Sequence, residues 1–114
     1  MINGEKRPWG FYENVFESDG FKIKHICVFP NKRLSLQSHK QRSEHWVITK
    51  GSCKVQVGKD ILVLNENQHI YIPKETLHRI ENIGKDNLHF TETQIGCYLG
   101  EDDIVRYEDD FGRN

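Results

Sequence analysis

Four residues in two short stretches have the chemistry of a metal site: Gln37, His39 and Glu44 in the first stretch, and His78 in the second. Side chains alternate between the two faces of a strand, so Gln37 and His39 point the same way if residues 34–39 are extended. A short turn then brings Glu44 back to that face from the next strand, and His78 begins a later strand that closes the ring. An amide oxygen, two imidazoles and a carboxylate suit a divalent first-row metal. The pattern predicts a metal-centred site for a small molecule.

The elements that must position these residues are short, mostly of period two, and separated by Gly, Asn, Asp and Pro. They predict strands over 21–29, 34–39, 46–48, 53–57, 61–64, 69–72, 78–83 and 88–95. Gly58-Lys59-Asp60 is typical of the turn of a hairpin. Only the tail from Glu101 to Phe111 has the pattern of a helical turn or two. Many short strands at close intervals predict an all-β sandwich or barrel, and a barrel of about eight strands can hold one small ligand inside.

Composition narrows the class of protein. The 114 residues have the length of one domain, expected to span 1–114, and the 16 basic and 17 acidic residues leave a formal net charge of −1. That balance gives no reason to expect nucleic acid or a membrane as partner. The three cysteines are widely spaced and form no Cys-x-x-Cys motif, which suits a reducing compartment. No signal peptide or membrane-spanning run is visible, so we expect a cytoplasmic protein.

The spacing within the two stretches resembles the paired motifs of the cupin superfamily. Four residues separate His39 from Glu44 and six more precede Gly51; five separate Asn67 from Pro73, four more precede His78, and three more precede Asn82. In cupins the first motif supplies His, His and Glu, and the second supplies His. This sequence departs from the pattern where Gln37 replaces the first histidine, and where Asn67 and Glu75 replace glycines.

Longer motifs resemble a narrower family, the isomerase domain of type II mannose-6-phosphate isomerases. They are Leu34–Gln37, Arg42–Trp46, Tyr71–Pro73, Arg7–Gly10 and Tyr98–Arg106 with its continuation to Arg113. The resemblance implies a cupin-type double-stranded β-helix, or jelly-roll barrel, and metal-dependent interconversion of mannose 6-phosphate and fructose 6-phosphate. Bifunctional members carry an upstream domain that makes GDP-mannose. This sequence has no such domain and no Gly-rich nucleotide loop, so we do not expect guanylyltransferase activity.

The resemblance implies that Gln37, His39, Glu44 and His78 hold one divalent metal. Zinc is the first expectation, and manganese, iron, cobalt or nickel also suit these donors. Taken singly, His39, Glu44 and His78 could equally belong to a polar network in the barrel wall. Gln37 could instead orient a ligand without touching the metal.

Catalytic and phosphate-binding residues are less defined. Arg42 could stabilise an enediolate or grip phosphate, because its planar fork binds oxyanions, or it could be an exposed loop arginine. Glu92 is the candidate base if its strand face lies inside the barrel, and a surface carboxylate otherwise. Lys40 and Arg106 are further candidates for binding phosphate. Arg79 is expected to point away from the face of His78 and to form a structural pair.

Other histidines are not expected to take part in the site: His45 should alternate outward from Glu44, and His25, His69 and His89 are assigned structural roles. Three functions stay open at this point. The first is the phosphosugar isomerase. The second is a related cupin ketoisomerase or epimerase acting on a sugar nucleotide, and the third is a non-catalytic sugar-binding accessory module. Cupins as a group also lead us to expect a homodimer.

Overall fold

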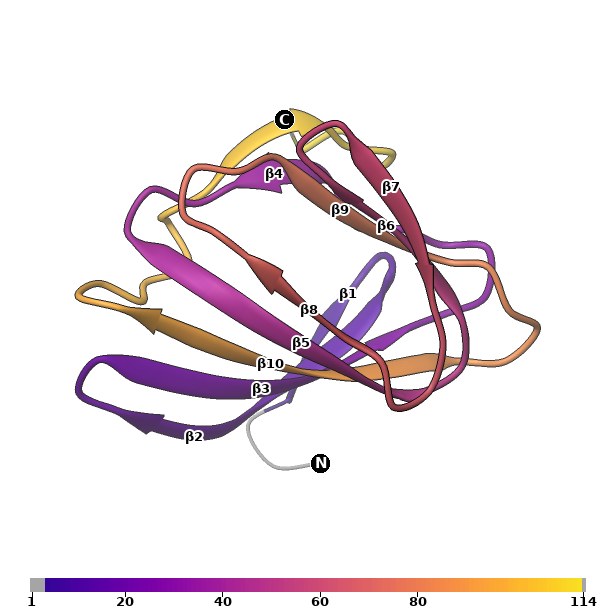
Figure 1. The fold of residues 1–114 in the computed structure, drawn as a ribbon, viewed down its shortest axis with the longest axis horizontal. Helices are drawn as coiled ribbons and strands as arrows, with labels where there is room; N and C mark the ends of the chain where they lie inside the picture. Colours follow the sequence, from indigo (N-terminus) through magenta and orange to yellow (C-terminus); the bar gives the residue numbers. More distant parts are fainter. Residues whose placement is uncertain (1–3, 114) are drawn as a thin grey trace.

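The computed structural model describes residues 4–113, which form eleven β-strands and no helix (Figure 1). The strands are β1 (Gly4–Arg7), β2 (Gly10–Ser18), β3 (Phe21–Val28), β4 (Leu36–Ser38), β5 (Arg42–Lys50), β6 (Cys53–Val57), β7 (Asp60–Leu64), β8 (His69–Ile72), β9 (His78–Asn82), β10 (Leu88–Gly96) and β11 (Val105–Glu108). Within this part of the chain nothing is helical, so no helix could cross a membrane.

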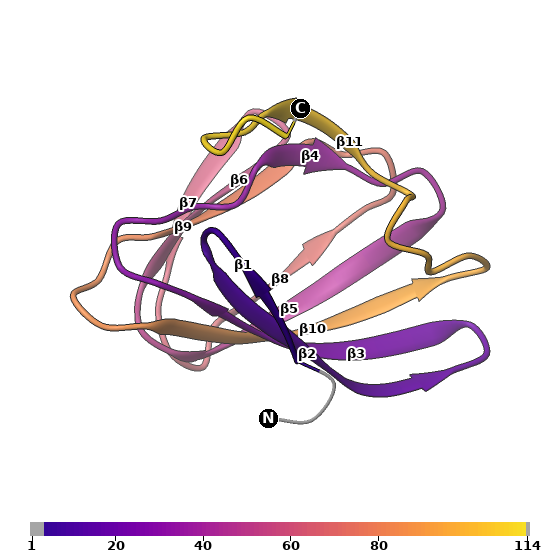
Figure 2. The same ribbon diagram turned by 180° about the vertical axis from the view of Figure 1, so that it is seen from behind.

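The strands pair antiparallel in two sheets that form opposite walls of a barrel (Figures 1 and 2). One sheet has the order β1-β2-β3-β10-β5-β8, and the other has the order β11-β4-β9-β6-β7. The all-β barrel predicted from the strand pattern is confirmed, and so is the cupin-type architecture that the family resemblance implies. The predicted hairpin is β6–β7, in which Val57 lies opposite Asp60.

The inner face of the larger sheet changes character along its strands. At one end Ile26, Phe90 and Ile48 lie side by side on β3, β10 and β5, and all three are buried. Moving toward the other end, the next inward rows contain Lys24 beside Glu92, and then Gln94 beside Glu44. Because side chains alternate strictly along a strand, the same face that builds the hydrophobic core continues into a buried polar end. The site is built at that end.

Two parts of the sequence-based prediction differ from the structure. The tail expected to form a helical turn contains β11, which pairs with β4 at the edge of the smaller sheet. The helical prediction was wrong because β4, the partner of β11, lies about 70 residues away in sequence, and a local sequence pattern does not reveal such a distant pairing. The strands β1 and β2 were not predicted, since a bulge between Asn14 and Phe16 breaks the alternation in β2.

Candidate metal centre

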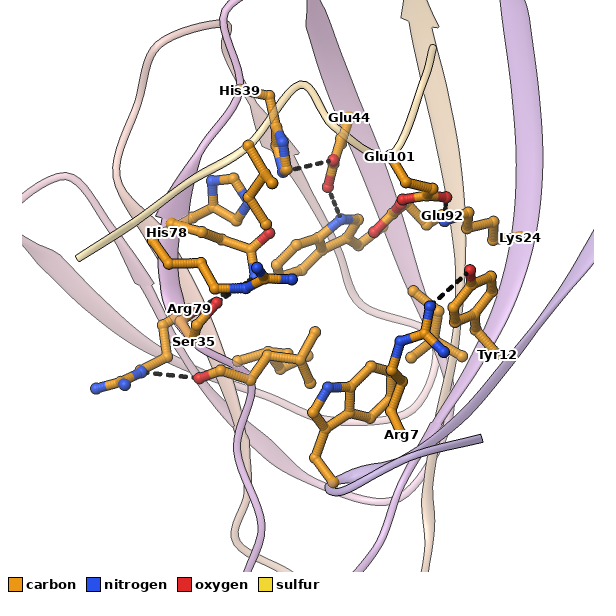
Figure 3. Close-up of a pocket in the computed structure, with 18 of the residues that line it drawn as sticks. Arg7, Tyr12, Lys24, Ser35, His39, Glu44, His78, Arg79, Glu92 and Glu101 are labelled. Carbon is orange, nitrogen blue, oxygen red and sulfur yellow. Dashed lines mark hydrogen bonds and ion pairs between the residues drawn. The ribbon is translucent and has the colours of Figure 1, made fainter. Parts of the chain in front are cut away.

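A cavity of about 120 Å³ lies at the polar end of the barrel, between the two sheets (Figure 3). The side chains of Trp9, Trp46, Ile26, Ile80 and Leu34 form its apolar wall. The cavity also reaches His39, Glu44 and His78, which converge from one side. The pocket therefore has the mixed lining typical of small-molecule sites, with an apolar wall and a few convergent polar groups.

His39, Glu44 and His78 form a compact cluster of metal-binding side chains. Their candidate ligand atoms all lie within 4.8 Å of one another, and all three residues are buried. His39 directly follows β4, Glu44 lies in β5 and His78 opens β9, so two strands and the turn after a third supply the cluster from both sheets. The His39 Nε2 atom lies 3.3 Å from a Glu44 carboxylate oxygen, and the two imidazole centroids are 5.0 Å apart. The structure thus brings together three of the four predicted ligands.

Hydrogen bonds orient both imidazoles toward the pocket. His39 Nδ1 donates to the backbone carbonyl of Asp103 at 2.7 Å, and His78 Nδ1 donates to the carbonyl of Thr76 at 2.9 Å. With Nδ1 donating in each ring, Nε2 is the atom left to face the site, and the Nε2 atom of His39 also accepts from Arg42 Nη2 at 3.3 Å. Burial lowers the pKa of His39 to about 4, which keeps this imidazole neutral at pH 7. Two imidazoles and one carboxylate fit a divalent cation.

The Glu44 carboxylate is held on both oxygens. Trp46 Nε1 donates to one oxygen at 2.9 Å, and Arg42 Nε donates to the other at 2.8 Å. Burial acts to raise the pKa of Glu44, but His78 and Arg42 outweigh burial and hold the pKa below its ordinary value. The side chain is therefore an anion that cannot rotate freely, as a metal ligand should be.

Gln37 lies beside this cluster. It is the cross-strand neighbour of His78 in the β4–β9 pair and lines the same pocket. Its amide nitrogen donates to the hydroxyl of Ser35 at 3.0 Å, so the amide oxygen is the atom left for another contact. That arrangement is compatible with a fourth ligand, and coordination by Gln37 stays a prediction.

Arg42 and Glu92 both lie inside the barrel, which removes the surface alternatives for each of them. Both line the pocket and both are buried. The Nη1 atom of Arg42 is buried without a hydrogen-bond partner, while Nη2 donates to His39 Nε2 at 3.3 Å. Glu92 accepts a hydrogen bond from Gln94 at 2.6 Å. Burial and the nearby Glu44 carboxylate raise the pKa of Glu92 to about 8.

Three further residues singled out in the sequence, Lys40, Arg79 and His45, take no part in the cluster of His39, Glu44 and His78. The Lys40 side chain is exposed, and only its backbone N–H is engaged, by Asp103. Arg79 binds the carbonyl of Leu34 and the Glu108 carboxylate with its guanidinium, as expected of a structural pair. His45 is exposed, and its ring lies against the Tyr71 ring with the centroids 4.7 Å apart, so its outward orientation is confirmed.

The three histidines assigned structural roles lie away from the cluster. The rings of His25 and His89 are stacked at 5.1 Å and joined by a hydrogen bond of 2.9 Å. His69 is exposed on β8.

Sequence reasoning missed a second polar group in the pocket, made by Tyr12, Lys24 and Glu101 (Figure 3). Lys24 pairs with the Glu101 carboxylate, and its ammonium lies 4.1 Å from the centre of the Tyr12 ring. The alternation of Lys22 and Lys24 along β3 was the available signal. Two lysines on one face of a strand next to a core run indicate a polar interior as readily as a solvent face.

We expect Asp103→Ala to weaken metal binding about 10- to 100-fold, the usual cost of losing a group that orients a ligand. The Asp103 carboxylate accepts hydrogen bonds from the backbone N–H groups of Lys40 at 3.0 Å and Gln41 at 2.9 Å, and so fixes the turn that carries His39. Titration with Co²⁺, followed by its visible absorption, measures the affinity. Asp102→Ala is the matched control, because Asp102 binds the Tyr98 hydroxyl instead. Equal affinities for the two variants would contradict this role.

Solved structures place this architecture in a class. Oxalate decarboxylase from Bacillus subtilis matches 92% of this chain and 30% of its own with a TM-score of 0.83 at 16% identity. The cupin domain of Schizosaccharomyces pombe Cnp3 matches 75% of this chain and 64% of its own with a TM-score of 0.73 at 16% identity. At these identities the likeness concerns the fold alone. Fold and site together define a cupin-type domain with a candidate metal centre.

The sequence comparisons give the family. The family described as "Mannose-6-phosphate isomerase C-terminal" matches residues 3–109, and the chain belongs to it. The xanthan biosynthesis protein XanB of Xanthomonas campestris is 49% identical over 94% of this chain and 23% of its own length. The alginate biosynthesis protein AlgA of Pseudomonas putida is 48% identical over 94% of this chain and 22% of its own length. A mannose-1-phosphate guanylyltransferase of Sinorhizobium fredii is 46% identical over 91% of this chain and 20% of its own. The chain thus spans only about a fifth of the length of these relatives.

Proposed function

We propose that this domain is a metal-dependent aldose–ketose isomerase that interconverts mannose 6-phosphate and fructose 6-phosphate. The observation that carries the proposal is the buried cluster of His39, Glu44 and His78, with Arg42 and Glu92 beside it in one pocket. Membership of the mannose-6-phosphate isomerase C-terminal family supports the choice of substrate. The sugar-nucleotide and non-catalytic alternatives have no comparable observation in their favour.

His39, Glu44 and His78 would hold the metal, with the amide oxygen of Gln37 as a fourth donor. A divalent cation there would act as a Lewis acid toward the oxygens of the open-chain sugar. Zinc is our first choice, since neutral imidazoles and a carboxylate are its usual ligands together with sulfur. The backbone carbonyls of Asp103 and Thr76 keep the two imidazoles in the orientation that this requires.

Aldose–ketose isomerisation transfers a proton between C2 and C1 of the open-chain sugar. Glu92 is our candidate base: its carboxylate removes the C2 proton of the aldose and then delivers that proton to C1. The hydroxyl proton of O2 passes to O1 in the same conversion, so that no proton is gained or lost overall. Negative charge develops on the carbonyl oxygen during the first step. The unpartnered Nη1 of Arg42 provides a fixed cationic donor inside the pocket, and preorganised donors of this kind stabilise developing oxyanions strongly.

Relatives suggest the setting of the reaction. Two of them are named as xanthan and alginate biosynthesis proteins, and others as mannose-1-phosphate guanylyltransferases. We therefore propose that the domain supplies or consumes phosphosugars for polysaccharide synthesis. A cytoplasmic location and a homodimer remain predictions from the sequence.

A coupled assay of mannose 6-phosphate conversion to fructose 6-phosphate tests the proposal. The protein would be stripped with a chelator and then supplied separately with zinc, manganese, iron, cobalt or nickel. Turnover that appears only with added metal supports the isomerase and identifies its active ions. Absence of turnover from folded, metal-loaded protein would reject mannose 6-phosphate as the substrate. The same protein would then be assayed with sugar nucleotides.

A further inference from the structure

Three arginines from the two ends of the chain line the pocket that holds the candidate metal centre. Arg7 ends β1, Arg106 lies in β11, and Arg113 belongs to the segment after β11. None of the three is part of the cluster of His39, Glu44 and His78. Their gathering in one pocket needs an explanation, because like charges repel one another most strongly where water is scarce.

Arg106 differs from the other cationic side chains of the pocket in having no acidic partner. Among the described residues, ion pairs join Arg7 to Glu5, Lys24 to Glu101, Arg42 to Glu44, Arg79 to Glu108 and Arg113 to Asp109. No such pair is formed by Arg106 within residues 4–113, and its Nε atom is buried without a hydrogen-bond partner. A buried donor left unpaired costs free energy unless a ligand completes it.

The surroundings of Arg106 are positive. Burial lowers its pKa, and the charges of Arg113 and Arg7 lower it further. The one acidic group that opposes them, Asp109, is already engaged by Arg113 through hydrogen bonds of 2.7, 2.7 and 3.1 Å. An anion entering beside Arg106 would therefore meet a guanidinium whose Nε atom is unpartnered, with two further cations lining the same pocket.

The strand register gives the distance between Arg106 and the metal cluster. Arg106 lies opposite Gln37 in the β11–β4 pair, and Gln37 lies opposite His78 in the β4–β9 pair. Two strand spacings, about 10 Å, therefore separate the backbones of Arg106 and His78 along one wall of the pocket. Arg7 lines the same pocket and donates to the Tyr12 hydroxyl at 3.2 Å (Figure 3). Arg106 and His78 thus line one cavity at this separation, with Gln37 between them.

We propose that Arg106, assisted by Arg7 and Arg113, binds the phosphate group of a sugar phosphate whose other end lies at His39, Glu44 and His78. The identity of the ester rests on the proposed isomerase function. The planar guanidinium fork matches the oxygens of a phosphate, and several arginines around one anion can neutralise its double charge. The site would select a phosphorylated sugar over the free sugar and hold the chain of carbon atoms along the pocket.

Calorimetric titration of the chelator-stripped protein, which cannot turn over, tests this site directly. The ligands are mannose 6-phosphate, mannose and inorganic phosphate. We expect mannose 6-phosphate to bind more tightly than mannose, and Arg106→Gln to weaken its binding about 10- to 100-fold, the cost of losing a charged hydrogen bond. Arg106→Lys should retain part of the affinity, because it keeps the charge and loses the fork. Lys85→Gln is the matched control. Lys85 is exposed and lies outside the pocket, so this substitution removes one positive charge without affecting the pocket lining.

The outcomes separate this proposal from the isomerase function. If mannose 6-phosphate binding depends on Arg106 but the protein has no isomerase activity, the phosphate site is supported and the isomerase reaction is rejected. Isomerase activity with an unchanged KM for mannose 6-phosphate in Arg106→Gln would keep the reaction and overturn the site. Equal affinity of the protein for mannose and mannose 6-phosphate would also overturn it. Thermal melting of each variant verifies the fold, and Arg106→Lys supplies the comparison if Arg106→Gln does not fold.

Discussion

His78→Ala is expected to lose the bound metal and, with it, the isomerase turnover that we propose. The His78 side chain supplies one of three clustered donors, and within residues 4–113 it makes one hydrogen bond, which it donates to the carbonyl of Thr76. The substitution therefore removes a ligand while leaving little else unsatisfied. The loss of metal affinity should exceed the 10- to 100-fold that follows removal of a group behind a ligand. Metal content after dialysis and the coupled assay measure the two effects.

His69→Ala is the matched control for this prediction, because His69 is exposed on β8 and does not line the pocket. Glu44→Ala tests the same site less cleanly. It would leave the buried Arg42 guanidinium and the Trp46 indole N–H without their shared acceptor, so that a loss of stability accompanies the loss of metal. A His78→Ala protein that keeps one metal per chain and full turnover would remove His78 from the site.

Much of the site was predictable from the sequence because its signals are local. Alternation along a strand placed Gln37 and His39 on one face, and the short turn after His39 returned Glu44 to the same pocket. The spacing of His78 after Pro73 carried the resemblance to cupins. These residues are close in sequence or belong to a known motif, so their mutual geometry follows from strand period and turn length.

The arginines of the pocket could not be predicted in this way. Arg7 and Arg113 are 106 positions apart in the sequence, and Arg106 reaches the pocket only because β11 pairs with β4. Strand pairing over such separations depends on tertiary packing rather than on local propensity. The same pairing overturned the helical prediction for the tail. The sequence offered Arg106 only as one of several cationic residues that could bind phosphate, whereas its unpartnered Nε atom is visible only in three dimensions.

Burial also decided questions that alternation left open. Glu92 and Gln94 share one face of β10, and the sequence does not say whether that face is inside or outside. The inward row that contains Glu92 also contains Lys24 and Trp46, directly across from it on the neighbouring strands. Because this row continues the hydrophobic core of Ile26, Phe90 and Ile48, its polar residues are enclosed by the barrel. The polar residues that follow the core residues along β10 therefore line the site and do not face solvent.

Glu92→Gln is expected to lower kcat by about 10²- to 10⁴-fold while metal binding is retained, because the amide cannot accept the C2 proton. The substitution keeps the volume of the side chain and its hydrogen bond from Gln94, and Glu92 is not one of the clustered ligands. Exchange of the C2 proton of mannose 6-phosphate with deuterated solvent isolates proton removal from all other steps, and it should fall in parallel with kcat.

The control for Glu92→Gln is Glu81→Gln, the same change on β9, where the carboxylate pairs with Lys54 on the outer face of the smaller sheet. That variant should isomerise and exchange the C2 proton at the wild-type rate. Metal content equal to wild type in both variants would show that the effect of Glu92→Gln arises after metal binding. If Glu92→Gln exchanges the C2 proton normally, the base is another group. The Glu92 carboxylate would then serve to hold Gln94 and to offset the charges of Lys24 and Arg42, which also act on its pKa.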